Sequence, residues 1–157
     1  MTRQRLYLAG PLFSAAERDF NERLRNALVD HFEVYLPQED GGLLVDMVAE
    51  GVSMAEATRR VFRMDVAALD WCDCLLITLD GRCIDEGASF ELGYAFAKGK
   101  RCIALQTDPR RLMLGGNNPM IDASVEATFH SFDELLDWAR LSHRSDPRSV
   151  ERVEVSS

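Results

Sequence analysis

The sequence contains no apolar run that approaches the length of a membrane span, and its first residues do not combine positive charge with a long apolar segment. A helix needs roughly 20 apolar residues to cross a bilayer, so we expect neither a membrane span nor a secretory signal. Positive charge is also scarce, because 18 Lys and Arg are outnumbered by 26 Asp and Glu, which gives a formal net charge of −8. Nucleic acids and anionic membranes attract basic patches, so neither is expected as a partner.

Sequence patterns that bind metals or nucleotide phosphates are absent as well. The cysteines, Cys72, Cys74, Cys83 and Cys102, form no C-x-x-C pair, and the three histidines are scattered. We therefore expect no zinc site and interpret the cysteines as free thiols in a reducing cytoplasm. Neither G-x-G-x-x-G nor G-x-x-x-x-G-K-[ST] occurs, so the chain lacks the dinucleotide fingerprint and the phosphate loop.

What is present is an alternation of strand-like and helix-like segments. Strands are expected at 5–10, 33–37, 74–79 and 101–107, with a short fifth strand within 127–132. Helices are expected at 14–32, 53–68, 88–98 and 131–141. This order indicates parallel βαβ units in a three-layer α/β sandwich of about five mainly parallel strands, flavodoxin-like or Rossmann-like. We place a single domain at residues 1–141 and a polar, disordered tail at 142–157.

Two of these helices should begin at capping boxes, in which a Ser caps the helix and a Glu three residues later bonds back to it. The pairs are Ser14 with Glu17 and Ser53 with Glu56. The segment 38–52 is expected to be a loop with one helical turn, and 108–125 to be a long polar loop. Loops of that length more often serve function than fill space.

In open parallel sheets the ligand binds at the carboxyl ends of the strands. This rule gathers residues 10–13, 80–89 and 107–120 on one rim. The stretch DEGASFELGYAFAKGK (85–100) opens a helix there, with Glu91 in its first turn. The helix is apolar nearly all round and should pack inside. A buried carboxylate is costly unless it is hydrogen-bonded or used in chemistry, whereas an ordinary first-turn carboxylate complements the helix dipole.

Two further acidic residues and a tyrosine could complete a site with Glu91. Asp85 lies six residues before it, and Gly87 allows the backbone to approach a ligand closely. Asp65 adjoins the apolar stripe of its helix, which we place at 57, 61, 64 and 68, and could point toward the same strand ends. One carboxylate as nucleophile and another as proton donor is the pairing used in glycosyl transfer. Tyr7 is a core tyrosine by default, although its hydroxyl could reach a carboxylate at the rim.

Four segments together resemble the nucleoside 2-deoxyribosyltransferase family. They are YLAGPLF (7–13), RMDVAALDWCD (63–73), DEGASFELGYAFAKGK (85–100) and NNPM (117–120). The third is the most specific, because it contains D-x-G-x-x-x-E-L-G-x-A followed by G-K. The resemblance runs from Tyr7 to about Trp138, which is most of the chain.

The resemblance implies an enzyme that transfers the 2-deoxyribosyl group between nucleobases. By motif, Glu91 is the nucleophile that attacks C1′ of a 2′-deoxynucleoside and forms a covalent deoxyribosyl intermediate. Asp65 contacts the base and relays its proton, Tyr7 hydrogen-bonds the nucleophile, and Asp85 binds a sugar hydroxyl. Further substrate-binding positions are Gly10, Pro11, Phe13, Gln38, Gly87 and Ser89. No metal or organic cofactor is implied, since a nearby carboxylate stabilises the cationic transition state.

The implied partners are 2′-deoxynucleosides, free nucleobases and a second copy of the chain. Asn118 and Met120 fit the N-x-M element that family members insert into the site of a neighbouring subunit. A homo-oligomer with its site completed in trans is therefore expected. The loop 108–119 could instead close over its own site.

Two other functions stay open. A nucleoside or nucleotide N-glycosidase of the same fold would give the sugar to water rather than to a base. In the related deoxynucleoside-monophosphate hydrolases a serine stands where this chain has Asp85, and an aspartate there would repel a 5′-phosphate. A non-catalytic nucleotide-binding module is the third possibility, because α/β sandwiches host many functions. The sequence does not decide between purine and pyrimidine bases.

Overall fold

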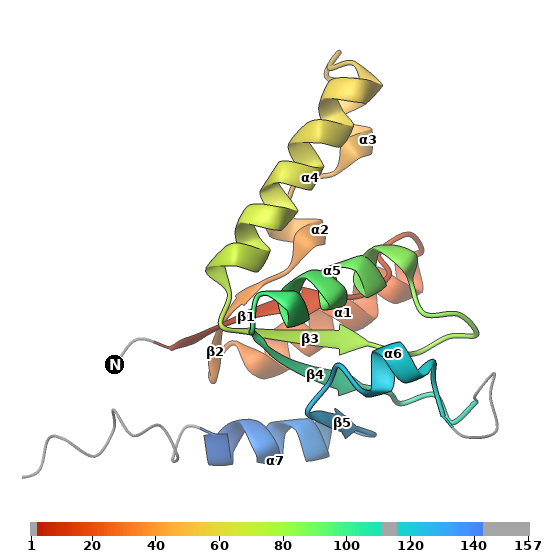
Figure 1. Ribbon diagram of the computed structural model, residues 1–157. Coiled ribbons are helices and arrows are strands. Elements are labelled where there is room, and N and C mark those ends of the chain that lie inside the picture. Colours follow the sequence, from red (N-terminus) through yellow and green to blue (C-terminus); the bar gives the residue numbers. More distant parts are fainter. Residues whose placement is uncertain (1–2, 111–115, 143–157) are drawn as a thin grey trace, which may run out of the picture.

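The computed structural model describes residues 3–110 and 116–142 (Figure 1). At its centre is a five-stranded sheet in the order β2-β1-β3-β4-β5, in which all neighbouring strands run parallel. The strands are β1 (Gln4–Ala9), β2 (Phe32–Tyr35), β3 (Cys74–Thr78), β4 (Arg101–Leu105) and β5 (Ala127–Phe129). The predicted parallel α/β architecture is confirmed, although most strands end one or two residues earlier than expected.

Helices cover both faces of the sheet and make the three predicted layers. They are α1 (Ala15–Leu28), α2 (Pro37–Asp40), α3 (Leu44–Ala49), α4 (Met54–Trp71), α5 (Glu86–Ala97), α6 (Pro119–Asp122) and α7 (Phe132–Ser142). α4 and α5 pack on the face that carries Leu75 and Ile77, and α1 and α7 on the face that carries Cys74 and Leu76. Alternate residues of β3 thus enter different cores, and the whole strand is buried, as its continuous apolar sequence predicts.

Both predicted capping serines stand at helix starts, but only one of the two capping boxes is complete. At α1 the Ser14 hydroxyl accepts from the Glu17 backbone N–H, and the Glu17 carboxylate accepts from the Ser14 N–H, which is a complete capping box. At α4 the Ser53 hydroxyl accepts from the Glu56 N–H. The Glu56 carboxylate, however, binds arginines one helical turn further along instead of bonding back to the cap.

Both segments predicted as loops contain short helices. The first holds α2 and α3, and the second holds α6. Pro37 and Pro119 stand in the first turns of α2 and α6, where a missing backbone N–H costs no intrahelical hydrogen bond. Residues 111–115 of the second loop and the predicted disordered tail from 143 onward lie outside the described residues.

The prediction that α5 is buried on all sides is wrong. Ala88, Leu92 and Ala95 face the core, but Phe90 and Phe96 are 54% and 57% exposed. A helix in the outer layer has only one side against the sheet, so apolar residues on its other sides stay in solvent unless a further element covers them. This exposed apolar surface lies beside α4, which extends beyond the sheet together with α3 (Figure 1).

Three findings concern the described ranges alone. No helix there is long and apolar enough to cross a membrane. No cluster of three or more His, Cys, Asp or Glu side chains there could hold a metal ion. All four cysteines are free thiols, three of them buried and Cys83 exposed.

Candidate active site

The strand order reverses at the carboxyl ends of β1 and β3, where open α/β sheets bind their ligands. Gly10 follows β1 at this point, and a Cβ placed on it would lie 3.3 Å from the Cβ of Thr78 in β3. The glycine therefore lets the end of β1 pass close to β3 without a side chain between them.

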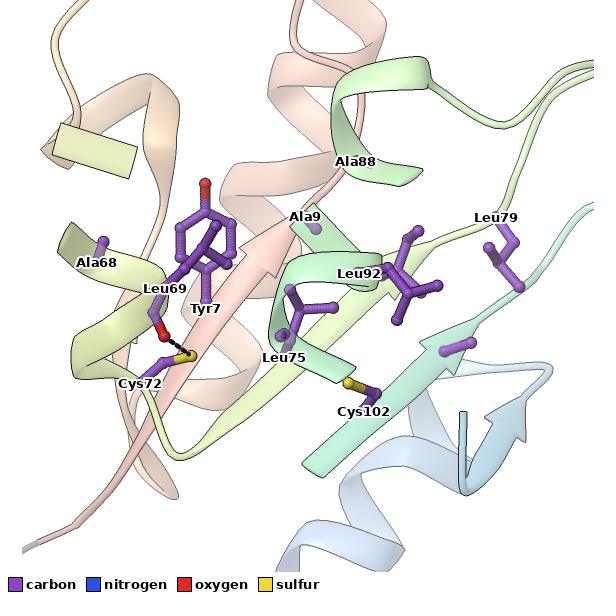
Figure 2. Packing of buried hydrophobic residues seen from close by; sticks show 13 residues of the cluster. Tyr7, Ala9, Ala68, Leu69, Cys72, Leu75, Leu79, Ala88, Leu92 and Cys102 are labelled. Atoms are coloured by element: carbon purple, nitrogen blue, oxygen red, sulfur yellow. Dashed lines mark hydrogen bonds between the residues drawn. The ribbon is translucent and has the colours of Figure 1, made fainter. Parts of the chain in front are cut away.

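Glu91 of α5 is held at this rim by a buried tyrosine. The Tyr7 hydroxyl donates to Glu91 Oε1 at 2.8 Å. Figure 2 shows the Tyr7 ring standing on β1 beside Leu69 of α4, with its hydroxyl directed away from the sheet. Burial raises the pKa of Glu91 to about 8, the charges of Asp65 and Asp85 add to the rise, and the Tyr7 hydrogen bond opposes it. Burial also raises the pKa of Tyr7, which keeps this hydroxyl a neutral donor.

Glu91 lies further into its helix than the sequence predicted. Because α5 begins at Glu86, Glu91 is in the second turn, beyond the reach of the helix-start dipole. Within the described residues its Oε2 accepts no hydrogen bond. Every fully buried polar side-chain atom there has a hydrogen-bond partner, so an atom without one is not fully buried. Oε2 is therefore accessible, so one carboxylate oxygen is held and the other is free to react.

Asp65 of α4 adds a second carboxylate near Glu91. Its Oδ1 accepts from the Tyr35 hydroxyl at 3.4 Å. Burial raises its pKa to about 6, and the Tyr35 hydrogen bond opposes this rise. The predicted apolar stripe through Met64 is wrong at that position, because Met64 is 39% exposed. Asp65, one residue later, is the half-buried side chain at this level of the helix.

Asp85 is the N-cap of α5, a role that the sequence analysis missed. Its Oδ2 accepts from the Ala88 backbone N–H at 2.8 Å. A Cβ on Gly87 would lie 3.1 Å from the same oxygen, and the Ser89 hydroxyl donates to the Asp85 carbonyl at 2.9 Å. The helix start thus fixes Asp85 near Glu91, and its contact with a sugar hydroxyl stays a prediction.

Gln38 is held by contacts with α1. Asn21, which is only 6% exposed, donates through Nδ2 to Gln38 Oε1 and to the Pro11 carbonyl, both at 2.9 Å. Gln38 Nε2 donates in turn to the Arg18 carbonyl at 3.2 Å. These bonds tie the loop after β1 to α2, and Phe13 extends from that loop 77% exposed. Base contacts by Gln38 or Phe13 stay predictions.

Asn118 and Met120 lie elsewhere on the rim. With Ser89 they line a cavity of about 460 Å³ between the β3–α5 loop and the segment after β4, and none of the residues around it is Glu91, Asp65 or Tyr7. Asn118 caps α6 by accepting from the Met120 N–H at 2.9 Å, and Met120 is 80% exposed. The structure therefore does not bring these two residues into the carboxylate pair of their own chain.

A buried amide anchors the segment that carries Asn118 and Met120. Gln106 and Asn117 exchange two hydrogen bonds through their side-chain amides, each at 3.0 Å. Asn117 Nδ2 also donates to Asp122 Oδ1 at 2.9 Å. These contacts fix the start of α6 against the end of β4.

The electrostatics of the carboxylate pair suit a positively charged reacting centre. The charges that raise the pKa of Glu91, Tyr7 and Tyr35 are those of the carboxylates Asp40, Asp65, Asp85 and Glu91. A pair of poorly solvated carboxylates without a basic partner stabilises a cation that develops beside it. This arrangement can support cleavage of a glycosidic bond, whose transition state is an oxocarbenium-like cation.

Sequence reasoning missed three residues that shape this rim: Tyr35, Asn21 and Gln106. Tyr35 follows the β-branched Val34 in a predicted strand, as Tyr7 lies in another. Each is a large ring whose hydroxyl needs a partner when it is buried, so the argument made for Tyr7 also applied to Tyr35. Asn21 and Gln106 gave a weaker signal, an amide within an otherwise apolar helix face or strand end.

Known proteins share both the sequence pattern and the fold. Residues 6–138 match the protein family described as nucleoside 2-deoxyribosyltransferase. A conserved protein from Enterococcus faecalis V583 is 26% identical, with a TM-score of 0.74 over 90% of this chain and 99% of that one. A 2-deoxyribosyltransferase from Bacillus psychrosaccharolyticus is 23% identical, with a TM-score of 0.71 over 85% of this chain and 90% of that one.

A CMP N-glycosidase from Clostridium botulinum is 19% identical, with a TM-score of 0.56 over 87% of this chain and 99% of that one. At these identities the transferase and glycosidase structures show a common fold only. No curated protein matches the sequence.

Proposed function

Because the chain belongs to the nucleoside 2-deoxyribosyltransferase family, we propose that it transfers 2-deoxyribosyl groups between nucleobases. One observation carries the proposal. Glu91 is a largely buried carboxylate held through Oε1 by the Tyr7 hydroxyl at 2.8 Å, with Oε2 accessible at the switch point of the sheet. A nucleophile that attacks C1′ needs this combination of fixed direction and one open oxygen.

In the first half-reaction Glu91 Oε2 attacks C1′ of a 2′-deoxynucleoside. The bond from C1′ to the base nitrogen breaks, and its electron pair leaves with the base. A proton from Asp65 neutralises the departing base, and Asp85 orients the sugar through a hydroxyl. The product is a deoxyribosyl ester of Glu91, with C1′ inverted.

In the second half-reaction a different base attacks C1′ from the face that the first base left. Asp65 takes the proton that the incoming base gives up, and Glu91 departs as a carboxylate. Two inversions retain the β configuration. Water in place of the base would hydrolyse the same intermediate, which is the N-glycosidase alternative.

Chromatography of deoxyinosine incubated with the protein, with and without adenine, tests the proposal. Deoxyadenosine that forms only with adenine supports transfer. Hypoxanthine released at one rate in both tubes means a hydrolase. If neither base exchange nor release occurs with purine or pyrimidine deoxynucleosides, or with their nucleotides, the chain is a binding module and the proposal fails.

The activity of the wild-type protein should follow a bell-shaped pH profile. The carboxylate pair has pKa values of about 6 for Asp65 and about 8 for Glu91, so between these values it holds one proton, mostly on Glu91. The productive form is the less populated one, in which that proton lies on Asp65 and Glu91 is ionised. Below pH 6 the pair holds two protons and Glu91 cannot attack, whereas above pH 8 the pair holds none and Asp65 has no proton to give. Initial rates of kcat/KM against pH check this, and a rate that stays flat from pH 5 to about 9 contradicts the paired roles.

A homo-oligomer is part of the proposal, with Asn118 and Met120 of one copy completing the site of another. The exposure of Met120 leaves it free to enter a second copy, and Phe62, Phe90 and Phe96 give α4 and α5 an exposed apolar surface. Phe62 and Phe90 lie side by side, with ring centroids 6.1 Å apart. Clustered exposed aromatic residues mark interaction surfaces. In the alternative arrangement the loop closes over the site of its own chain. Ser89 favours this alternative, because it lines the same cavity as Asn118 and Met120.

Complementation between two damaged variants decides between these arrangements. One is Glu91→Gln and the other Asn118→Ala combined with Met120→Ala. If sites are shared in a dimer, co-refolding the two should restore about a quarter of wild-type activity, because half of randomly formed dimers are mixed and each has one intact site. If each site uses its own loop, mixing restores nothing. A fully active monomer in sedimentation would also contradict the shared site.

A further inference from the structure

Tyr35 stands next to Tyr7 in the sheet and repeats its arrangement. The two residues are paired in the register of β1 and β2, so both side chains leave the same face of the sheet. Their rings stack with centroids 5.3 Å apart and an interplanar angle of 21°. Tyr7 donates to Glu91 at 2.8 Å, and Tyr35 donates to Asp65 at 3.4 Å. Each of two stacked phenols therefore serves one of the two carboxylates.

The backbone at Gly41 closes over the contact between Tyr35 and Asp65. A Cβ on Gly41 would lie 2.9 Å from the Tyr35 hydroxyl and 2.9 Å from Asp65 Oδ1. Gly41 is buried, and its φ of −91° is open to any residue, so glycine serves here to leave space and not to permit an unusual backbone. The protein thus encloses the hydroxyl and Oδ1 on this side, and within the described residues Asp65 Oδ2 takes no hydrogen bond.

Building on the proposed function, we propose that Tyr35 is a positioning residue for the proton transfer by Asp65. Its hydroxyl holds Oδ1 and leaves Oδ2 to face the base. It also stabilises the ionised carboxylate that remains after the proton has gone to the leaving base. The base itself is not touched by Tyr35, which acts through Asp65.

The surroundings of Asp65 make Tyr35 the main group able to stabilise its charge. Glu91 of α5, Asp85 at the start of α5 and Asp40 of α2 supply negative charge to this cluster, and Tyr7 is the other phenol in it. No lysine or arginine among the described residues contributes to the pKa of Asp65. Burial disfavours the ionised form of Asp65, and the hydrogen bond from Tyr35 to Oδ1 is the interaction that offsets part of this cost.

Tyr35→Phe removes the hydroxyl and keeps the stacked ring, so it isolates this effect. Titration of the aspartate side-chain carboxyl carbons by NMR, with Asp65→Asn to assign the signal, should show the pKa of Asp65 raised by about half a unit to one unit in Tyr35→Phe. This measurement needs no substrate, so it decides the link between Tyr35 and Asp65 even if transfer activity is absent. An unchanged pKa overturns the inference whatever the enzyme does.

The pH profile of turnover supplies the second readout, with Tyr7→Phe as the matched variant. Tyr35→Phe should move the acid limb of the bell to higher pH and leave the alkaline limb in place. Tyr7→Phe should move the alkaline limb upward, because it removes the bond that lowers the pKa of Glu91. A loss in Tyr35→Phe that is equal at every pH indicates a purely structural role and rejects the positioning role.

A double-mutant cycle keeps the test decisive if Tyr35→Phe is also less stable. A residue that acts through Asp65 should add almost nothing to the loss already caused by Asp65→Asn, whereas a residue that supports the fold independently should add its full effect. Thermal melting of all variants identifies any that are unfolded. Additive losses in folded variants overturn the inference while leaving the proposed transferase function untouched.

Discussion

Replacing Glu91 with glutamine is expected to slow base exchange at least about a thousandfold, because an amide cannot form the glycosyl ester. The substitution is nearly isosteric, and the amide oxygen can still accept the hydrogen bond from Tyr7. Substrate binding should therefore persist, and the loss should fall on kcat more than on KM. Product formation by chromatography and nucleoside binding by calorimetry measure the two separately.

The same variant should be more stable than the wild type in alkaline solution. The folded pKa of Glu91, about 8, exceeds its ordinary value of 4.5, so the folded state binds the extra proton. The stability that Glu91 contributes is thus fully present below pH 4.5 and is lost as the pH rises to 8, by on the order of 5 kcal/mol for this group. Thermal melting at about pH 9 should show Glu91→Gln above the wild type, with little difference near pH 5.

Three results would count against the proposed role of Glu91. Retention of more than about a tenth of the wild-type rate would mean that another group forms or replaces the covalent intermediate. Failure to find a deoxyribosyl adduct on the peptide containing Glu91, in acid-quenched wild type by mass spectrometry, would mean that the sugar passes directly between bases. A Glu91→Gln protein that is inactive and also unfolded at pH 5 would show that the residue serves the fold.

The elements that carry the site were predictable because local patterns specify them. The continuous apolar run of β3 and the Ser14 capping box are set by residues close together in sequence, and both were found as expected. The hydrogen bond between Tyr7 and Glu91 was expected from the family resemblance, whereas burial alone indicated only that each of the two groups would need a partner.

What could not be predicted depends on distances across the fold. Met64 and Asp65 differ by only 100° around a helix, so apolar periodicity alone did not decide which one faces the sheet. The partnership of Tyr35 with Asp65 depends on the register between β1 and β2 and on the close approach of the loop at Gly41. Burial of α5 was overestimated, since a sequence does not reveal whether a second apolar face is covered by the same chain.

Asp65→Asn should reduce exchange between ordinary nucleobases by about a hundredfold to ten-thousandfold, the range expected when a general acid is lost. Asparagine keeps the size of the side chain and an oxygen for the Tyr35 hydroxyl, so the fold should survive. The alkaline limb of the pH profile should also disappear. With no proton to lose from position 65, activity should rise as Glu91 ionises and then stay level.

A substrate whose leaving group needs no proton separates this role from that of Glu91. 4-Nitrophenyl 2-deoxyriboside loses a stabilised phenolate, so Asp65→Asn should cleave it at nearly the wild-type rate, whereas Glu91→Gln should fail on this substrate and on nucleosides alike. Release of nitrophenolate, followed by its absorbance in both variants, makes the comparison direct. If Asp65→Asn loses the same factor on the nitrophenyl compound as on deoxyinosine, Asp65 positions the sugar or the nucleophile, and the proton reaches the base by another path.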